Sequence, residues 1–386
     1  MKSLFFVSCP LGFEKKLVQE ISRFWFLLID KDGLPTRSEL PEFEIYKGGV
    51  EFSTELHLGL QVNFFTKMGL RVLLRIGKFK ARYYDQFEKE IKKIKWHNYF
   101  NLEQFPELSV QIDASKSRLN NSGNLKEAFS HALDSKIKLK DESLNQVMIR
   151  IEDDFVEVSL NTSGEHLHFR GYRKEQGEAP LRENLAALVV DYIDTPTYQQ
   201  ITVIDPFVGA GTLLFEAALK DYPVLQRDYD FLKSKYVPSL FKSDSWKKNF
   251  KHLLNRKLNL FGVEQDVHTF EKLRNNIKTF QNLFFDLSIN IQNADSQTAL
   301  LNDLKLSAQP LWIVANPPYG ERLGVDKSKV LSILSRFAAE LQPQGMIILH
   351  PTDWPLNFEG YRFSQKIPFS NQGLRLSLSV IVKSAQ

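Results

Sequence analysis

The four residues Asn316, Pro317, Pro318 and Tyr319 are of types that could do chemistry together. They follow a short apolar run, 311–314, which suits a buried strand, so we expect a functional loop at a strand end. Two consecutive prolines remove two backbone N–H donors and fix both φ angles, which leaves the Asn316 amide oxygen and the Pro317 carbonyl as rigid acceptors. These acceptors could bind both hydrogens of an exocyclic amine and direct its lone pair at an electrophile, while Tyr319 stacks on the ring. The pattern favours amino-group methylation, and an ordinary Asn-Pro turn with a packed tyrosine is the alternative.

A second candidate site begins at Asp205, directly after the apolar run 201–204. A strand, a glycine-rich turn and a helix over 213–219 predict a nucleotide-type site, where Gly209 and Gly211 let a ligand approach the backbone. The turn opens with Asp-Pro and lacks a third glycine, so it departs from the fingerprint that binds a pyrophosphate. A carboxylate in the loop favours a zwitterionic or cationic ligand, and S-adenosylmethionine fits better than NAD. The residues expected to bind this cofactor are Asp205, Pro206, Gly209, Gly211 and Thr212.

More polar side chains follow the next expected strands of this half. Glu264 ends the strand 258–263 and could accept hydrogen bonds from both ribose hydroxyls, and Asp266 follows it as a further cofactor residue. Asp295 follows another strand and could meet the adenine amine, with a helix N-cap as the alternative role. Asn316 is expected to contact the cofactor as well as the amine. Because the carboxyl ends of parallel strands meet at one edge of a sheet, all of these groups are expected to line one crevice.

Composition limits the classes of protein to consider. With 386 residues and 43% hydrophobic content, the chain can build two or three folded domains. Cys9 is the only cysteine, which excludes an intramolecular disulfide and a cysteine-based zinc cluster and suits a reducing compartment and a metal-free mechanism. The apolar core of the N-terminus, 4–7, is shorter than the roughly seven residues of a signal peptide, and no apolar run approaches the roughly 20 residues that cross a bilayer. We therefore expect a cytoplasmic protein without a membrane partner.

The front half alternates strands and helices in a small α+β pattern, with the positive charge concentrated in one segment. The net charge of the chain is only +4, but residues 65–97 hold ten basic side chains against three acidic ones. Aromatic residues are interleaved with them, and such a surface could bind phosphates and stack unpaired bases. Solvated faces of two ordinary elements with core aromatics are the alternative. A loop of small polar and basic residues, 114–123, precedes an expected helix and could hold a phosphate or serve as a plain N-cap.

Together these motifs resemble the family of THUMP-domain class I methyltransferases that modify guanine N2 in RNA, most nearly the bacterial large-subunit ribosomal RNA type. The resemblance runs nearly end to end. The front half carries Y-K-G-G-V-E-F and W-H-N-Y-F. The back half carries H-F-R-G-Y-R, A-P-L-R-E-N-L-A-A, D-P-F-V-G-A-G-T-L-L-F-E-A-A, N-P-P-Y-G-E-R-L-G and N-Q-G-L. Departures are small: Val208 and Ala210 replace the commoner cysteine and serine, and Glu264 stands where aspartate is usual.

The resemblance implies a fold, a cofactor and a substrate. It implies an N-terminal ferredoxin-like portion over 1–55, a THUMP RNA-binding domain over 56–163 and a Rossmann-like, doubly wound methyltransferase domain over 164–386. It further implies S-adenosylmethionine as methyl donor and the loop Asn316–Tyr319 as the holder of a guanine in ribosomal RNA. The expected reaction is direct methyl transfer to the guanine amine, with the base unpaired or flipped into the pocket. The alternatives are methylation of transfer RNA, of adenine N6 or of a protein glutamine, and a non-catalytic RNA-binding or ribosome-assembly factor.

Overall fold

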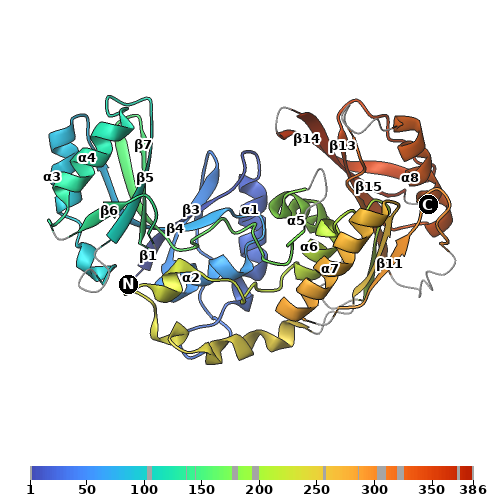
Figure 1. Ribbon diagram of the computed structural model, residues 1–386, viewed down its shortest axis with the longest axis horizontal. Helices are drawn as coiled ribbons and strands as arrows, with labels where there is room; N and C mark the ends of the chain where they lie inside the picture. The colour runs from blue at the N-terminus through green and yellow to red at the C-terminus, as the bar shows by residue number, and fades with distance from the viewer. Residues whose placement is uncertain are drawn as a thin grey trace. The chain divides into compact units, whose positions relative to one another are not determined.

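The chain folds into two compact units, seen in the computed structural model of Figure 1. Unit 1 comprises residues 1–167 and 227–250, and unit 2 comprises residues 168–226 and 251–386. The structure describes residues 2–101, 107–135, 137–143, 145–175, 181–193, 200–254, 258–285, 287–301, 310–319, 326–371 and 374–384. Within these ranges no helix is both long and apolar enough to cross a membrane.

Unit 1 is built on one eight-stranded sheet in the order β2-β3-β1-β4-β8-β7-β5-β6. The pairs that β5 forms with β6 and β7 are parallel, and the other pairs of this sheet are antiparallel. The strands are β1 (Lys2–Ser8), β2 (Phe43–Tyr46), β3 (Gly49–Glu55), β4 (Arg71–Lys80), β5 (Glu107–Ser115), β6 (Lys138–Lys140), β7 (Gln146–Glu152) and β8 (Phe155–Asn161).

The helices of unit 1 bury apolar stripes spaced at three and four residues. In α1 the stripe is Leu17, Ile21 and Phe24, and in α3 it is Phe87 and Ile91. Figure 1 shows α3 and α4 side by side at the β5–β7 end of the sheet. The α-helices are α1 (Glu14–Phe24), α2 (Leu56–Phe65), α3 (Tyr84–Lys92) and α4 (Ser122–Ala132). The 3₁₀-helices are η1 (Trp25–Leu27), η2 (Trp96–Asn98), η3 (Asp230–Lys233), η4 (Ser239–Phe241) and η5 (Asp244–Leu254).

The boundary expected between residues 55 and 56 does not separate two folded bodies. Strand β4 follows α2 along the chain and pairs with β1, as in the register Phe5 opposite Leu74. The other edge of β4 pairs with β8. Residues 56–80 therefore complete the N-terminal strands, and a continuous ladder of hydrogen bonds joins the expected ferredoxin-like and THUMP portions.

The expected methyltransferase domain of residues 164–386 is not continuous, because residues 227–250 belong to unit 1. Aromatic side chains of this segment surround the fully buried ring of Phe64 on α2. Trp246 stacks on it with ring centroids 4.8 Å apart, and Tyr229 meets it edge-on at 5.1 Å. This aromatic cluster attaches the segment to the N-terminal sheet and helices.

Unit 2 is a doubly wound α/β unit, as expected. Its seven-stranded sheet has the order β11-β10-β9-β12-β13-β15-β14. The strands β11, β10, β9, β12 and β13 are parallel, and β15 is antiparallel to both of its neighbours. The strands are β9 (Ile201–Asp205), β10 (Leu258–Glu264), β11 (Ile289–Asn293), β12 (Leu311–Ala315), β13 (Gly345–Pro351), β14 (Tyr361–Asn371) and β15 (Leu374–Lys383). The helices are α5 (Glu183–Asp191), α6 (Thr212–Leu219), α7 (Val267–Leu283) and α8 (Lys327–Leu341).

The order of the parallel strands reverses between β9 and β12. The chain runs outward from β9 through β10 to β11, returns to β12 on the other side of β9, and continues to β13. In such sheets ligands bind in the crevice outside the carboxyl ends of the strands at this reversal. A buried core that includes Ile204, Ile313, Ile348 and Phe337 supports the strands and α8 below it.

Candidate functional site

Three predicted site residues end adjacent strands of unit 2. Asp205 is the last residue of β9, Glu264 is the last residue of β10, and Asn316 follows β12 directly. In the sheet Asp205 lies opposite Gly262 of β10, and β12 pairs with β9 one residue earlier, at Ile204. The sheet therefore brings the three residues to its carboxyl edge at the strand reversal, where the sequence places them.

Asp205 is a buried carboxylate, 1% exposed. Its Oδ1 accepts a hydrogen bond from the backbone N–H of Phe207 at 2.9 Å. Burial raises the pKa of Asp205 to about 7, and the nearby Glu264 carboxylate adds to the rise while the Phe207 N–H opposes it. No basic side chain among the described residues pairs with Asp205, so its charge is available to a cationic ligand.

The loop after Asp205 is held by its backbone. Gly209 and Gly211 have φ values of +53° and +95°, a region that side chains disfavour. The Gly209 N–H donates to Glu264 Oε2 at 3.1 Å, and the Val208 N–H donates to the Val263 carbonyl at 3.1 Å. These bonds fix the loop against the end of β10.

Glu264 has a second bond, because its Oε1 accepts from the N–H of Asp266 at 2.8 Å. Burial raises the pKa of Glu264, and these backbone N–H groups oppose the rise. Asp266 is exposed and caps α7, since its carboxylate accepts from the Thr269 N–H at 2.7 Å. Asp266 thus has a structural role as the N-cap of α7, for which an aspartate directly before a helix is a typical sequence signal. The hydrogen bonds of this cap stabilise the charged carboxylate and lower the pKa of Asp266.

Asp295 is also engaged within the protein. Its Oδ1 accepts from the Gln297 N–H at 2.9 Å, and its Oδ2 pairs with Lys329 Nζ at 2.8 Å. Both contacts lower the pKa of Asp295. The carboxylate therefore stabilises the turn at residues 295–297 and holds Lys329 in the first turn of α8. This structural role is close to the helix-capping role considered as the alternative. The remaining loop residues are buried: Pro206, whose carbonyl accepts from Ser296 Oγ, and Thr212, which begins α6.

The loop after β12 presents a buried acceptor. Asn316 Oδ1 is inaccessible to solvent and has no hydrogen-bond partner among the described residues. Pro317 is buried, Pro318 is half-buried, and Tyr319 packs against the core below the loop, where burial raises its pKa. A buried oxygen that accepts no hydrogen bond costs folding free energy. The presence of such an oxygen therefore points to a bound ligand that donates the hydrogen bond. Residues 320–324 of the motif lie outside the described residues.

A buried ionic network that the sequence did not reveal lies beside α6. Arg170 Nη2 pairs with Glu216 Oε2 at 3.3 Å, and the Tyr172 hydroxyl donates to Glu216 Oε1 at 2.9 Å. A further pair joins Arg173 and Glu183 at 3.1 Å. The available signal was a single glutamate in the otherwise apolar helix α6, since a buried carboxylate requires a partner. This network fixes the helix that carries the Asp205 loop.

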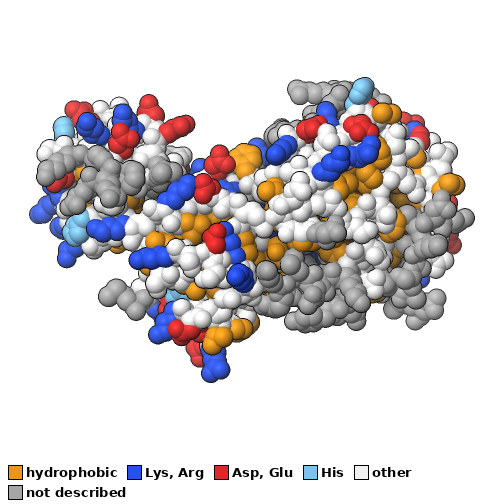
Figure 2. Space-filling model, turned by 60° about the horizontal axis from the view of Figure 1, so that its bottom comes forward, with side chains coloured by type: hydrophobic (Ala, Val, Ile, Leu, Met, Phe, Trp, Pro, Cys, Tyr) orange, Lys and Arg blue, Asp and Glu red, His pale blue; other side chains and the backbone are white. Residues whose placement is uncertain are grey.

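The basic segment of unit 1 divides into buried and exposed parts. Arg75 is buried and pairs with Glu51 at 3.2 Å and Glu157 at 2.9 Å. Phe87 and Trp96 are core residues, as the alternative interpretation held, whereas Tyr83 is 52% exposed. The start of α4 is capped by Asn121, whose side chain accepts from the Asn124 N–H. The segment is therefore not a uniform basic face, and Figure 2 shows basic and acidic side chains interspersed over the surface.

The described residues contain no candidate metal site. Within those ranges no three His, Cys, Asp or Glu side chains gather in a way that could hold a metal ion. The metal-free mechanism remains a prediction.

Comparison with known proteins finds one family match and several relatives. Residues 170–350 match the family UPF0020, described as RMKL-like, methyltransferase domain. Ribosomal RNA large subunit methyltransferase K/L of Shewanella frigidimarina is 28% identical over 346 residues, which cover 83% of this chain and 44% of that protein. The Methylococcus capsulatus protein of the same name is 25% identical over 378 residues, with 88% and 45% covered. The chain therefore spans less than half the length of these curated relatives. A possible methylase from Clostridium difficile 630 shares the fold, with a TM-score of 0.76 at 22% identity over 100% of this chain and 99% of that one.

Proposed function

We propose that this chain, whose residues 170–350 match the RMKL-like methyltransferase domain family, methylates the exocyclic N2 of a guanosine in RNA, with S-adenosylmethionine as methyl donor. The proposed substrate is 23S ribosomal RNA. The names of the curated relatives, which are large-subunit ribosomal RNA methyltransferases, support this choice of substrate. A cytoplasmic location goes with the proposal, because the substrate is an RNA.

The residues at the ends of β9 and β10 fit the donor. Asp205 offers a buried carboxylate for a cationic group. At Gly209 an added Cβ would meet no atom nearer than the Phe207 carbonyl at 4.0 Å, so a ligand can approach the backbone there. Glu264 ends the neighbouring strand and can accept from ribose hydroxyls with the lone pairs that its two backbone bonds leave free. When bound, S-adenosylmethionine supplies an electrophilic methyl group.

The single observation that carries the proposal is the buried Oδ1 of Asn316, which has no hydrogen-bond partner among the residues that the structure describes. An exocyclic amine is a donor with two hydrogens, and Asn316 Oδ1 together with the Pro317 carbonyl can accept both. When both hydrogens are bound in this way, the nitrogen lone pair points away from the two hydrogen bonds and toward the proposed site of S-adenosylmethionine. Tyr319 can stack on the base. No general base is required of the protein, because the amine becomes acidic as its nitrogen is alkylated and can release its proton to water.

The experiment is transfer of labelled methyl groups from S-adenosylmethionine to unmodified ribosomal RNA and to transfer RNA, followed by nucleoside analysis. We expect N2-methylguanosine in the ribosomal fraction. Label in transfer RNA or on adenine would refute the proposed substrate but not the donor. RNA binding without transfer would favour the assembly-factor alternative.

Two glycines of the loop provide a matched pair of variants. In Gly209→Ala the new methyl group enters open space, so we expect the free energy of unfolding to fall by only about 1 kcal/mol, from the left-handed backbone, while affinity for S-adenosylmethionine falls about tenfold or more. In Gly211→Ala the methyl group would lie 2.6 Å from the Phe215 ring and 2.7 Å from Leu273 Cδ1, so unfolding should become easier by about 2 to 5 kcal/mol. Thermal unfolding and equilibrium dialysis of both variants check this. Wild-type donor affinity in Gly209→Ala would contradict the placement of the donor at this loop.

A further inference from the structure

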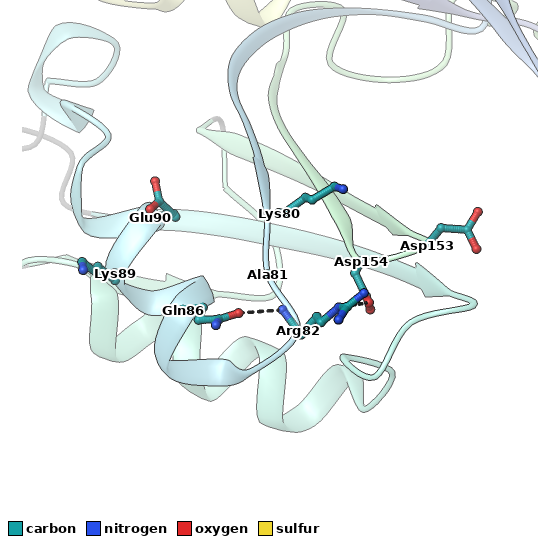
Figure 3. A pocket seen from close by; sticks show the side chains of 8 residues that line it. All are labelled: Lys80, Ala81, Arg82, Gln86, Lys89, Glu90, Asp153 and Asp154. Carbon is teal, nitrogen blue, oxygen red and sulfur yellow. Dashed lines mark hydrogen bonds and ion pairs between the residues drawn. The ribbon is translucent and has the colours of Figure 1, made fainter.

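Three connections of unit 1 meet at one end of its sheet. They are the segment after β4, the loop between β5 and α4, and the tight turn between β7 and β8. Asp154 in that turn joins all three: its carboxylate accepts from Arg82 Nε at 3.1 Å and from Ser117 Oγ at 2.8 Å, and its carbonyl accepts from the Ala81 N–H at 3.0 Å. Figure 3 shows Arg82 lying against Asp154 and the Arg82 backbone bonded to Gln86. We call this end of unit 1, residues 80–83, 116–118 and 153–155 together with Lys89 of the adjoining helix α3, the tip.

The backbone of the tip is strained. Lys116, Asp153 and Asp154 have φ values of +49°, +51° and +64°, which lie in the left-handed region. Such conformations cost free energy in residues with side chains, and the hydrogen bonds of Asp154 hold two of the three loops in place around them. The tip is therefore a defined surface and not a set of independent loops.

Two aromatic rings are displayed on the tip. Tyr83 and Phe155 are 52% and 53% exposed, although rings of this size are ordinarily buried. A cation lies beside each ring: Lys80 Nζ is 4.4 Å from the centroid of Phe155, and Arg118 Nη1 is 3.1 Å from the Tyr83 hydroxyl. Each ring thus pairs an exposed apolar surface with a positive charge.

The charges of the tip are of two kinds. Arg82 and Lys116 form ion pairs with Asp154 and Glu152. Lys80, Lys89 and Arg118 have no carboxylate partner among the residues that the structure describes. Lys80 and Lys89 line an open cavity of about 530 Å³, shown in Figure 3, with Arg82, Gln86, Glu90 and Asp153. The three unpaired cations are suited to anions, and the rings beside them are suited to planar groups.

We propose that the tip binds a single-stranded stretch of the RNA substrate, with unpaired bases stacked on Tyr83 and Phe155 and phosphates bound by Lys80, Lys89 and Arg118. This rests on the proposed function, in which the substrate is RNA. Every base has a π face, so stacking on the two rings tolerates any sequence, and a duplex would keep its bases away from them. The tip accordingly supplies affinity for RNA and takes no part in donor binding.

The test uses the full chain and a fluorescein-labelled single-stranded RNA of mixed sequence, with the duplex of the same sequence as a second probe. Tyr83→Ser and Phe155→Ser are each expected to weaken binding of the single strand about fivefold or more. Arg118→Gln is expected to reduce the slope of log K against log salt by about 0.7. Phe26→Ser is the matched control, because Phe26 is a 61% exposed ring elsewhere in unit 1, and it should bind as the wild type does.

The outcomes separate this inference from the proposed function. Three outcomes would overturn the inference. One is that the two ring variants bind the single strand as strongly as the wild type does, and another is that the wild type does not bind it. The third outcome is a Phe26→Ser control that loses as much affinity as the ring variants do. Loss of RNA affinity in the ring variants with unchanged affinity for S-adenosylmethionine supports it. If that pattern is seen while the wild type transfers no methyl group, the RNA surface stands and the proposed reaction fails.

Discussion

Replacing Asn316 by alanine is expected to lower kcat for methyl transfer by about 10²- to 10³-fold, with the melting temperature unchanged or raised. The loss follows because the buried Oδ1 acceptor, which has no partner among the described residues, is removed from the position where it can orient the amine. The unchanged stability follows because a buried oxygen without a donor destabilises the folded protein, so its removal relieves a cost. Single-turnover transfer to RNA and thermal unfolding measure the two effects.

Asn316→Asp is the matched control. The aspartate keeps an oxygen in the acceptor position, so its transfer rate should lie above that of Asn316→Ala, while the buried charge should lower the melting temperature. A wild-type rate in Asn316→Ala, or a lowered melting temperature with no loss of rate, would show that Asn316 serves packing and not the reaction.

Replacing Asp205 by asparagine is expected to abolish most donor affinity at pH 8 and to stabilise the protein at that pH. The pKa of Asp205 is raised to about 7 in the folded protein, against about 4 in an unfolded chain. Between these values the folded protein keeps a proton that the unfolded chain has lost, so the free energy of unfolding falls as pH rises through this window. The contribution is on the order of 3 to 4 kcal/mol by pH 8, and the asparagine variant lacks it.

Unfolding measured at pH 4.5 and pH 8 for both proteins checks this prediction, and calorimetric titration with S-adenosylmethionine checks the donor affinity. The difference in the free energy of unfolding between the variant and the wild type should be small at the lower pH and largest at the higher pH. Asparagine keeps an oxygen for the Phe207 N–H, so the loop bond survives in the variant. A variant that binds the donor as tightly as the wild type at pH 8 would refute the assignment of Asp205 to a cationic group of the donor.

The sequence alone determined the strands of unit 2 and the candidate groups at their ends. Asp205, Glu264 and Asn316 each follow a short apolar run, and apolar runs with polar exits are local patterns. The alternation of strands with helices predicts a parallel sheet, and the parallel sheet brings the strand ends together. The fold class and the adjacency of these strand ends could therefore be predicted without any knowledge of distant contacts, whereas the roles of these residues in binding the methyl donor and the base remain predictions.

Which distant residues meet became visible only in the folded chain. Folding placed residues 227–250 around Phe64 and joined Arg170 to Glu216. It also separated the buried rings of Phe87 and Trp96 from the exposed ring of Tyr83, although all three lie in one basic and aromatic segment. Periodicity reports which face of an element is apolar, but the partner of a buried charge or ring lies tens of residues away along the chain. That partner is selected by packing and by the need to satisfy buried polar groups, which no local pattern contains.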